Sequence, residues 1–272
     1  MKIYTCLAAV LVTLASCRQI NTPAETTAVQ TPTATDFLFQ YSIIDALLAG
    51  VYDGDLAVGE LKRHGDFGIG TFNGLDGEMI VIDGKVLKMR ASGEVIEVPD
   101  SIKTPLAFVK FFKPDTAFVI QGQSINYEEL KTRLSPYVNE NKMYAVRLKG
   151  NFHTVKARSV APAPKPYPEL AAYLAAGGQT SFSFSDTRGT CIGFVSPVYT
   201  ARTSVPGYHL HYVNENLSQG GHIFDFEADT LSVEIDIAQG FTIELNTNKD
   251  YDKADLDKNR KEELKTVEQK SK

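Results

Sequence analysis

Three of the five histidines in the chain lie close together and could hold a metal ion: His209, His211 and His222. Side chains two positions apart on a strand point to the same face, so His209 and His211 can reach one point together. The stretch 218–221 predicts a turn that returns His222 beside them on the next strand. A single histidine is more often an ordinary surface or core residue, but this clustering favours a metal site. Three imidazoles that leave one coordination position open are typical of catalytic zinc.

Glu78 is a second candidate for chemistry, because it follows a glycine-rich segment. Residues 68–77 contain four glycines and end in an Asp-Gly pair. This pattern predicts a turn from which Glu78 begins a strand. A carboxylate in that position could complete a metal site or transfer a proton. A solvated glutamate beside a turn is the alternative from the sequence alone.

Arg158 is the third candidate. The segment 152–160 alternates as a strand does, and a period of two puts Arg158 on the same face as Phe152 and Lys156. A guanidinium group can bind a substrate carboxylate through two parallel hydrogen bonds. The alternative is an arginine in a surface ion pair.

The elements that position these residues are mostly strands, so we expect a strand-rich α+β fold with a few helices. Asp83-Gly84 between two short apolar runs predicts a tight hairpin. Asn126, with Glu129 three positions later, predicts a capped helix that ends at Leu134. Further helices are predicted at 43–51 and 169–176. Strands are predicted at 78–82, 85–89, 94–98, 106–112, 117–120, 144–148, 152–160, 180–184, 190–196, 208–214, 222–226, 230–237 and 241–245.

The N-terminal segment indicates export. Residues 1–16 are typical of a signal peptide, with an apolar run too short to span a bilayer. Leu-Ala-Ser-Cys at 14–17 resembles a bacterial lipobox, so we expect a lipid anchor on Cys17, followed by a flexible Thr/Ala/Pro-rich tether at 17–36. The protein would then be a membrane-anchored lipoprotein on the periplasmic or cell-surface side. An ordinary signal peptide cleaved nearby is the alternative.

Composition limits the classes of function. The chain has a formal net charge of −5 at pH 7 and no basic cluster, which argues against a nucleic-acid partner. Acylation of Cys17 would leave Cys191 alone in the body, so no disulfide framework is expected, and Cys191 reads as a small buried hydrophobe. We expect a β-rich half at 37–160, a proline-rich connection, and a second β-rich half at 161–247 that carries the histidines.

Four segments together resemble α-acetolactate decarboxylase: GTFNGLDGE at 70–78, RS at 158–159, PGYHLH at 206–211 and GGHIFD at 220–225. The similarity runs from about residue 37 into the tail. It implies two interleaved mixed β-sheet halves, a homodimer, and a zinc enzyme without an organic cofactor. The implied reaction converts 2-acetolactate, a 2-hydroxy-3-keto acid, to (R)-acetoin and CO₂. The implied zinc ligands are His209, His211 and His222.

The resemblance also implies roles for four other residues. Thr71 and Glu78 would line the site, and Arg158 would contact the substrate. The charged tail at 248–272 reads as solvated on composition alone. The resemblance predicts instead that this tail returns to the site and brings Glu268 to the metal.

Two other classes of protein remain possible on the sequence. One is a lipid-anchored module that binds a metal or a sugar without catalysis. The other is a different metalloenzyme of the cupin type, because that class also uses His-x-His with a distant histidine and a glutamate. Redox activity or a requirement for iron would favour the cupin-like alternative.

Overall fold

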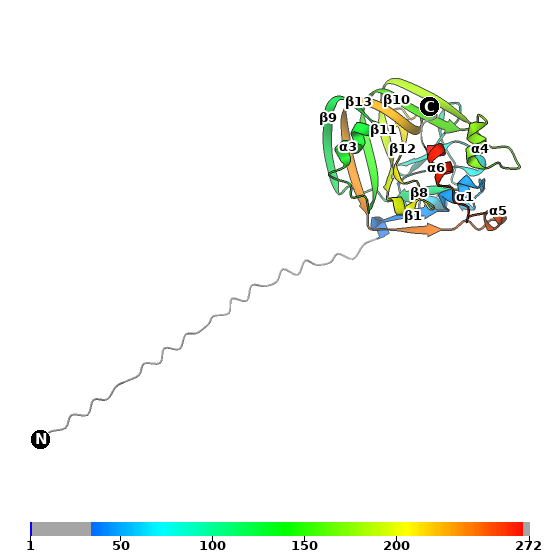
Figure 1. Ribbon diagram of the computed structural model, residues 1–272. Coiled ribbons are helices and arrows are strands. Elements are labelled where there is room, and N and C mark those ends of the chain that lie inside the picture. Colours follow the sequence, from blue (N-terminus) through cyan, green and yellow to red (C-terminus); the bar gives the residue numbers. More distant parts are fainter. Residues whose placement is uncertain (2–33, 269–272) are drawn as a thin grey trace. The chain divides into compact units, whose positions relative to one another are not determined.

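The computed structural model describes residue 1 and residues 34–268 (Figure 1). Apart from residue 1, the predicted signal peptide lies outside the described residues, as do Cys17 and the tether up to residue 33. In the part of the chain that is described, no helix is long and apolar enough to cross a membrane.

The first sheet has seven strands in the order β14-β1-β8-β3-β4-β5-β6. The hairpin predicted at Asp83-Gly84 joins β4 to β5. Both turn residues have positive φ, 49° and 76°, as the favoured two-residue turns require. Among these strands, β1 and β14 pair in parallel and the other neighbours are antiparallel. The strands are β1 (Phe37–Tyr41), β3 (Phe67–Thr71), β4 (Glu78–Ile82), β5 (Lys85–Met89), β6 (Val95–Glu97), β8 (Ala107–Lys110) and β14 (Gly240–Glu244). A separate two-stranded pair comprises β2 (Leu56–Ala57) and β7 (Lys103–Thr104).

The second sheet is antiparallel and closes on itself. Its order is β10-β11-β12-β13-β9, and β10 also pairs with β13, so four of the five strands form a barrel. The strands are β9 (Thr116–Asn126), β10 (Met143–Val160), β11 (Gln179–Ser196), β12 (Gly207–Asn214) and β13 (Gly220–Ala238). Three of them were predicted as two strands each. β10 and β13 are continuous because register shifts near Gly150 and Ala228 replace the expected turns, and β11 follows β10 in one register along its length.

The two sheets are interleaved along the chain. The second sheet combines β9 and β10 with the later strands β11 to β13, whereas β14 returns to pair with β1. The predicted boundary at residue 160 therefore falls between β10 and β11, which are neighbours in one sheet. The prediction of a strand-rich α+β fold with interleaved sheets is confirmed.

The helices are short and stand where the sheets meet or end. Asn126 caps α3 as predicted, because its side chain accepts a hydrogen bond from the Glu129 amide at 2.9 Å. The Glu129 carboxylate binds Arg133 at 2.7 Å and does not complete a capping box. The helices are α1 (Ile44–Leu48), α2 (Val58–Leu61), α3 (Tyr127–Leu134), α4 (Leu170–Ala175), α5 (Lys249–Lys253) and α6 (Lys261–Glu268), with 3-10 turns η1 (Ala34–Asp36), η2 (Asn73–Leu75) and η3 (Val198–Thr200).

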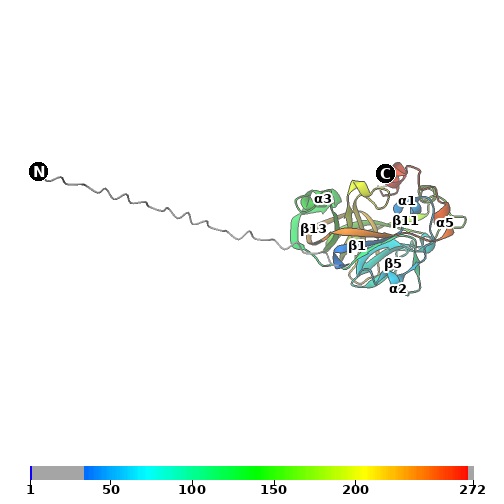
Figure 2. The ribbon, with the colours of Figure 1, turned by 90° about the horizontal axis from the view of Figure 1, so that it is seen from below.

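Three apolar layers form the core. One fills the barrel and packs on α3, and another covers the outer face of the first sheet beside α2, next to β5 in Figure 2. The third lies between the sheet and the barrel, where α1, α4 and α6 also contribute side chains. On β12, Leu210 and Tyr212 face the barrel interior and Val213 faces the third layer, so the predicted alternation of this strand is confirmed. The candidate site lies at the third layer.

Candidate metal and active site

Two neighbouring strands of the barrel bring the three histidines together. His209 and His211 lie on β12, and His222 lies on β13 directly opposite His211. The nearest ring centroids are those of His209 and His222, 5.0 Å apart. One ring nitrogen from each histidine lies within 4.8 Å of the others. The cluster predicted from the sequence is therefore present and compact.

The turn that joins these strands is not where it was predicted. Gly220 and Gly221 belong to β13, so the connection spans 215–219. The Asn214 side chain fixes this position, because its oxygen accepts hydrogen bonds from the amides of Ser218 (2.8 Å) and Gln219 (3.0 Å). Gly221 is needed for close approach between strands, because a Cβ there would lie 2.5 Å from the Arg158 carbonyl oxygen.

The histidines are held as neutral imidazoles. His211 Nδ1 lies 2.8 Å from the Met79 carbonyl oxygen, so this nitrogen donates and Nε2 keeps its lone pair. His211 Nε2 is buried without a hydrogen-bond partner. Burial lowers the pKa of His209 to about 3 and holds the pKa values of His211 and His222 well below the usual range, and the charge of Arg158 acts in the same direction. A buried lone pair without a partner beside two other neutral imidazoles fits a metal ion.

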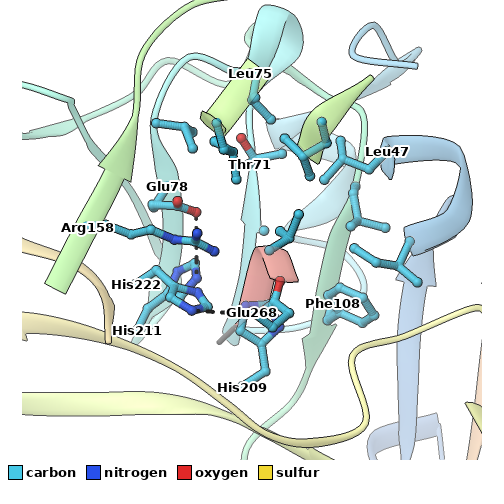
Figure 3. Close-up of a pocket in the computed structure, with 17 residues that line it drawn as sticks. Leu47, Thr71, Leu75, Glu78, Phe108, Arg158, His209, His211, His222 and Glu268 are labelled. Carbon is cyan, nitrogen blue, oxygen red and sulfur yellow. Dashed lines mark ion pairs between the residues drawn. The ribbon is translucent and has the colours of Figure 1, made fainter. Parts of the chain in front are cut away.

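Two carboxylates from distant parts of the chain face this cluster (Figure 3). Glu78 Oε2 lies 3.7 Å from His211 Nε2, and Glu268 Oε2 lies 3.6 Å from His222 Nε2. Burial raises the pKa of Glu78 to about 7; Arg158 opposes this shift and Glu268 adds to it. Burial likewise raises the pKa of Glu268. Desolvation thus favours the protonated form of both groups, whereas a bound cation would favour their anions.

Arg158 lies on β10 opposite His222 and points into the same pocket (Figure 3). It is 5% exposed. Its Nη1 donates to Gln179 Oε1 at 2.9 Å, and its guanidinium lies over the Phe224 ring. The prediction that Arg158 shares a face with Phe152 is wrong, because register shifts between these residues turn Phe152 into the barrel core.

Thr71 and Glu78 come from the first sheet, where they pair across β3 and β4. The Thr71 hydroxyl donates to the Gly77 carbonyl at 2.7 Å and so closes the loop that precedes Glu78. As predicted, Glu78 is the first residue of its strand. The rest of the pocket is apolar, with Leu47 and Phe108 opposite Glu78 and Arg158 in Figure 3. The pocket therefore has one wall of polar groups and one of hydrocarbon.

The tail returns to the pocket, which its charged composition did not indicate. In α6, Leu264 and Val267 lie on one side of the helix and are buried in the third layer. Val267 and Glu268 line the pocket.

Sequence reasoning missed three groups that support the site. Phe224 follows His222 by two positions on the same strand, so alternation could have indicated it. The Met79 carbonyl that fixes His211 and the Gln179 side chain that holds Arg158 belong to other strands. No local pattern indicates these two contacts, because each depends on pairing between distant segments.

The fold and site define a β-rich protein with a three-histidine cluster that could hold a metal ion and that faces two carboxylates and an arginine, which is the donor set of a metal-dependent enzyme. A family model described as alpha-acetolactate decarboxylase matches residues 38–258. The chain therefore belongs to the α-acetolactate decarboxylase family. Glu268 lies beyond the matched residues, so its place in the site rests on the structure.

Individual relatives agree with the family model. The alpha-acetolactate decarboxylase of Methanosarcina mazei is 45% identical over 236 residues, which are 86% of this chain and 81% of that protein. The Brevibacillus brevis enzyme of the same name is 38% identical, over 83% of this chain and 78% of its own. The crystal structure of alpha-acetolactate decarboxylase from Bacillus subtilis strain 168 superposes with a TM-score of 0.82 at 34% identity, covering 86% of this chain and 99% of that one.

Replacing His211 with alanine should abolish metal binding, because it removes one of three ligands and leaves the Met79 carbonyl without its donor. We expect metal content measured by mass spectrometry to fall from about one ion per chain to below about a tenth. His153→Ala is the matched control, since His153 is exposed and pairs with Asp229 on the surface. Full metal occupancy in the His211 variant would contradict the ligand assignment.

Proposed function

We propose that this chain decarboxylates 2-acetolactate to (R)-acetoin and CO₂ at a zinc ion held by His209, His211 and His222. The observation that carries the proposal is the placement of Arg158 and Glu78 against the histidine cluster, in a chain of this family. Three neutral imidazoles suit zinc, and Glu268 offers an oxygen ligand beside them. A non-catalytic binding module would not require a buried arginine and a proton-transferring carboxylate in the same pocket.

Arg158 would orient the substrate. A zinc ion in this site would act as a Lewis acid for the negative charge that develops on the ketone oxygen as CO₂ leaves. The Arg158 guanidinium, anchored by Gln179 and Phe224, presents N–H groups toward the pocket for the substrate carboxylate. Holding that carboxylate aligns the carbon–carbon bond that breaks, so that its electron pair can move toward the adjacent ketone.

Glu78 would supply the proton that replaces CO₂. Burial raises the pKa of Glu78 to about 7 and a bound cation would lower it, so Glu78 would be a carboxylate that takes up a proton from solvent and passes it to the substrate carbon as CO₂ leaves. Because Glu78 is fixed at the start of β4, it would deliver the proton to one face of the substrate carbon, which yields one enantiomer of acetoin. Thr71 holds the loop next to Glu78. The apolar wall would exclude water and pack against the small alkyl groups of the substrate.

The first test of this function is acetoin formation by the purified protein from racemic 2-acetolactate, with zinc measured on the same sample. We expect (R)-acetoin at about one zinc per chain, loss of activity after chelation, and recovery when zinc is restored. Chiral gas chromatography identifies the enantiomer. Zinc bound at full occupancy without acetoin would reject the proposed reaction, and recovery with iron but not zinc would favour the cupin-like alternative.

Arg158→Ala should retain metal but lose turnover, because the variant removes the group that aligns the carboxylate. We expect kcat/KM to fall about 100-fold or more. Arg158→Lys should recover little of this loss, since an ammonium group cannot form two parallel hydrogen bonds. Arg147→Ala on the same strand is the control, because Arg147 binds Glu234 outside the pocket. Normal turnover in Arg158→Ala would remove this residue from the mechanism.

We also propose that the protein is exported and tethered through a lipid on Cys17. The support is the lipobox-like sequence at 14–17 and the Thr/Ala/Pro-rich stretch that follows it. Bacterial cells that express the full chain should incorporate labelled palmitate, and Cys17→Ala should abolish the label and release the protein from the membrane fraction. Cys6→Ala, within the predicted signal peptide, is the control. Label retained in Cys17→Ala would reject the anchor. The homodimer implied by the family resemblance stays a prediction.

A further inference from the structure

Arg260 is a buried arginine outside the pocket that the proposed mechanism does not use. Its side chain is 2% exposed, and the residue immediately precedes the first residue of α6. Both terminal nitrogens lie 3.1 Å from Glu169 Oε1, and Nη1 lies 2.7 Å from Glu263 Oε2. One guanidinium group therefore joins two carboxylates that are 94 positions apart in the sequence and stand at the starts of different helices.

The two carboxylates belong to the helices that cover the pocket. Glu169 is the N-cap of α4, whose Leu170 and Leu174 line the pocket. Glu263 lies in the first turn of α6, whose C-terminal residue Glu268 faces His222. The two helices lie side by side in Figure 1. Arg260 thus links the apolar cover of the pocket to the segment that carries its second carboxylate.

The helix α6 needs such a contact to hold one orientation. A helix of eight residues is too short to be stable by itself and depends on packing. Its buried side chains are Leu264 and Val267, and hydrophobic contact is not directional. The forked, charge-assisted bonds of Arg260 are directional, and its guanidinium group is buried, whereas Glu169 and Glu263 are partly exposed.

We infer that Arg260 is a positioning residue for Glu268: by binding Glu169 and Glu263 together, it fixes α6 against α4 and so sets the place of the Glu268 carboxylate beside His222. Arg260 and Glu268 stand at opposite ends of a helix about 12 Å long. A tilt of about 5° at one end then moves the other by about 1 Å, a displacement that can cost about 100-fold in rate. This inference rests on the proposed function.

Lys258 provides a matched control. It pairs with the same two carboxylates, at 3.1 Å from Glu169 and 2.8 Å from Glu263. Its side chain is 40% exposed, so its ion pairs are screened by water and its loss should have little effect. Comparing the Lys258 and Arg260 variants therefore separates the effect of the directional guanidinium contact from the effect of a positive charge near the same two carboxylates.

The kinetic test compares Arg260→Gln with Lys258→Ala in two backgrounds. In the natural background we expect Arg260→Gln to lower kcat by about tenfold to 100-fold with zinc retained, and Lys258→Ala to stay within about twofold. In a Glu268→Gln background, Arg260→Gln should add no more than about twofold, because both changes remove the same contribution. If Arg260→Gln lowers kcat as much in the Glu268→Gln background as in the natural background, the inference is overturned.

A second readout does not depend on activity. Hydrogen–deuterium exchange of residues 261–268 should become about tenfold faster in Arg260→Gln, while exchange in β10 stays unchanged. Unchanged exchange in 261–268 would overturn the positioning role even if acetoin forms normally, and faster exchange would support it even if acetolactate proves not to be the substrate. If Arg260→Gln does not fold, Glu263→Gln removes one of the two carboxylates, and the same comparisons apply.

Discussion

The site depends on the pairing register of three barrel strands. His211 on β12 lies opposite His222 on β13, and His222 in turn lies opposite Arg158 on β10. Because side chains alternate between the two faces of a strand, a slip of one residue would send the moved side chain into the barrel core. The register shift between Lys156 and Ala157 is therefore part of the site: it places one extra residue in β13, so that His222 lies opposite Arg158 while Ile223 and Phe226 both stay in the barrel core. Gly221 allows β13 to approach β10 closely enough to form this row.

The remainder of the site depends on how the first sheet docks on this row. The Met79 carbonyl accepts a hydrogen bond from His211 Nδ1 across the two sheets, so the strand that presents Glu78 also fixes the tautomer of a metal ligand. A buried ion pair between Lys110 on β8 and Asp236 on β13 ties the same two sheets away from the pocket. Both charges are almost fully buried, so removing either partner would leave an uncompensated charge in the core. The pocket is therefore complete only when the two sheets are docked on each other.

Local signals predicted much of this architecture, and non-local pairings account for what they missed. Alternation put His209 and His211 on one face, and the turn residues at Asp83-Gly84 identified a hairpin correctly, because both effects act within a few residues. The turn before His222 was misplaced because the Asn214 side chain ends it early. The contacts made by Gln179 to Arg158, and by Glu169 to Arg260, join segments whose proximity depends on the whole chain path. The charged tail was misread from composition because its docking depends on only a few residues: Leu264 and Val267 are buried in the third layer, and Arg260 binds Glu169.

Two polar atoms of the pocket residues lack a hydrogen-bond partner, and their chemistry indicates which ligands the pocket could bind. His211 Nε2 and Arg158 Nε are both buried without a hydrogen-bond partner among the described residues. A buried orphan of this kind is costly, so its presence calls for an occupant. The histidine atom carries a lone pair, which suits a cation, and the arginine atom carries an N–H, which suits an anion. A dication with Arg158 would outweigh the charges of Glu78 and Glu268 by one unit, which matches a substrate with one carboxylate. A metal ion together with a small keto acid would satisfy both atoms at once.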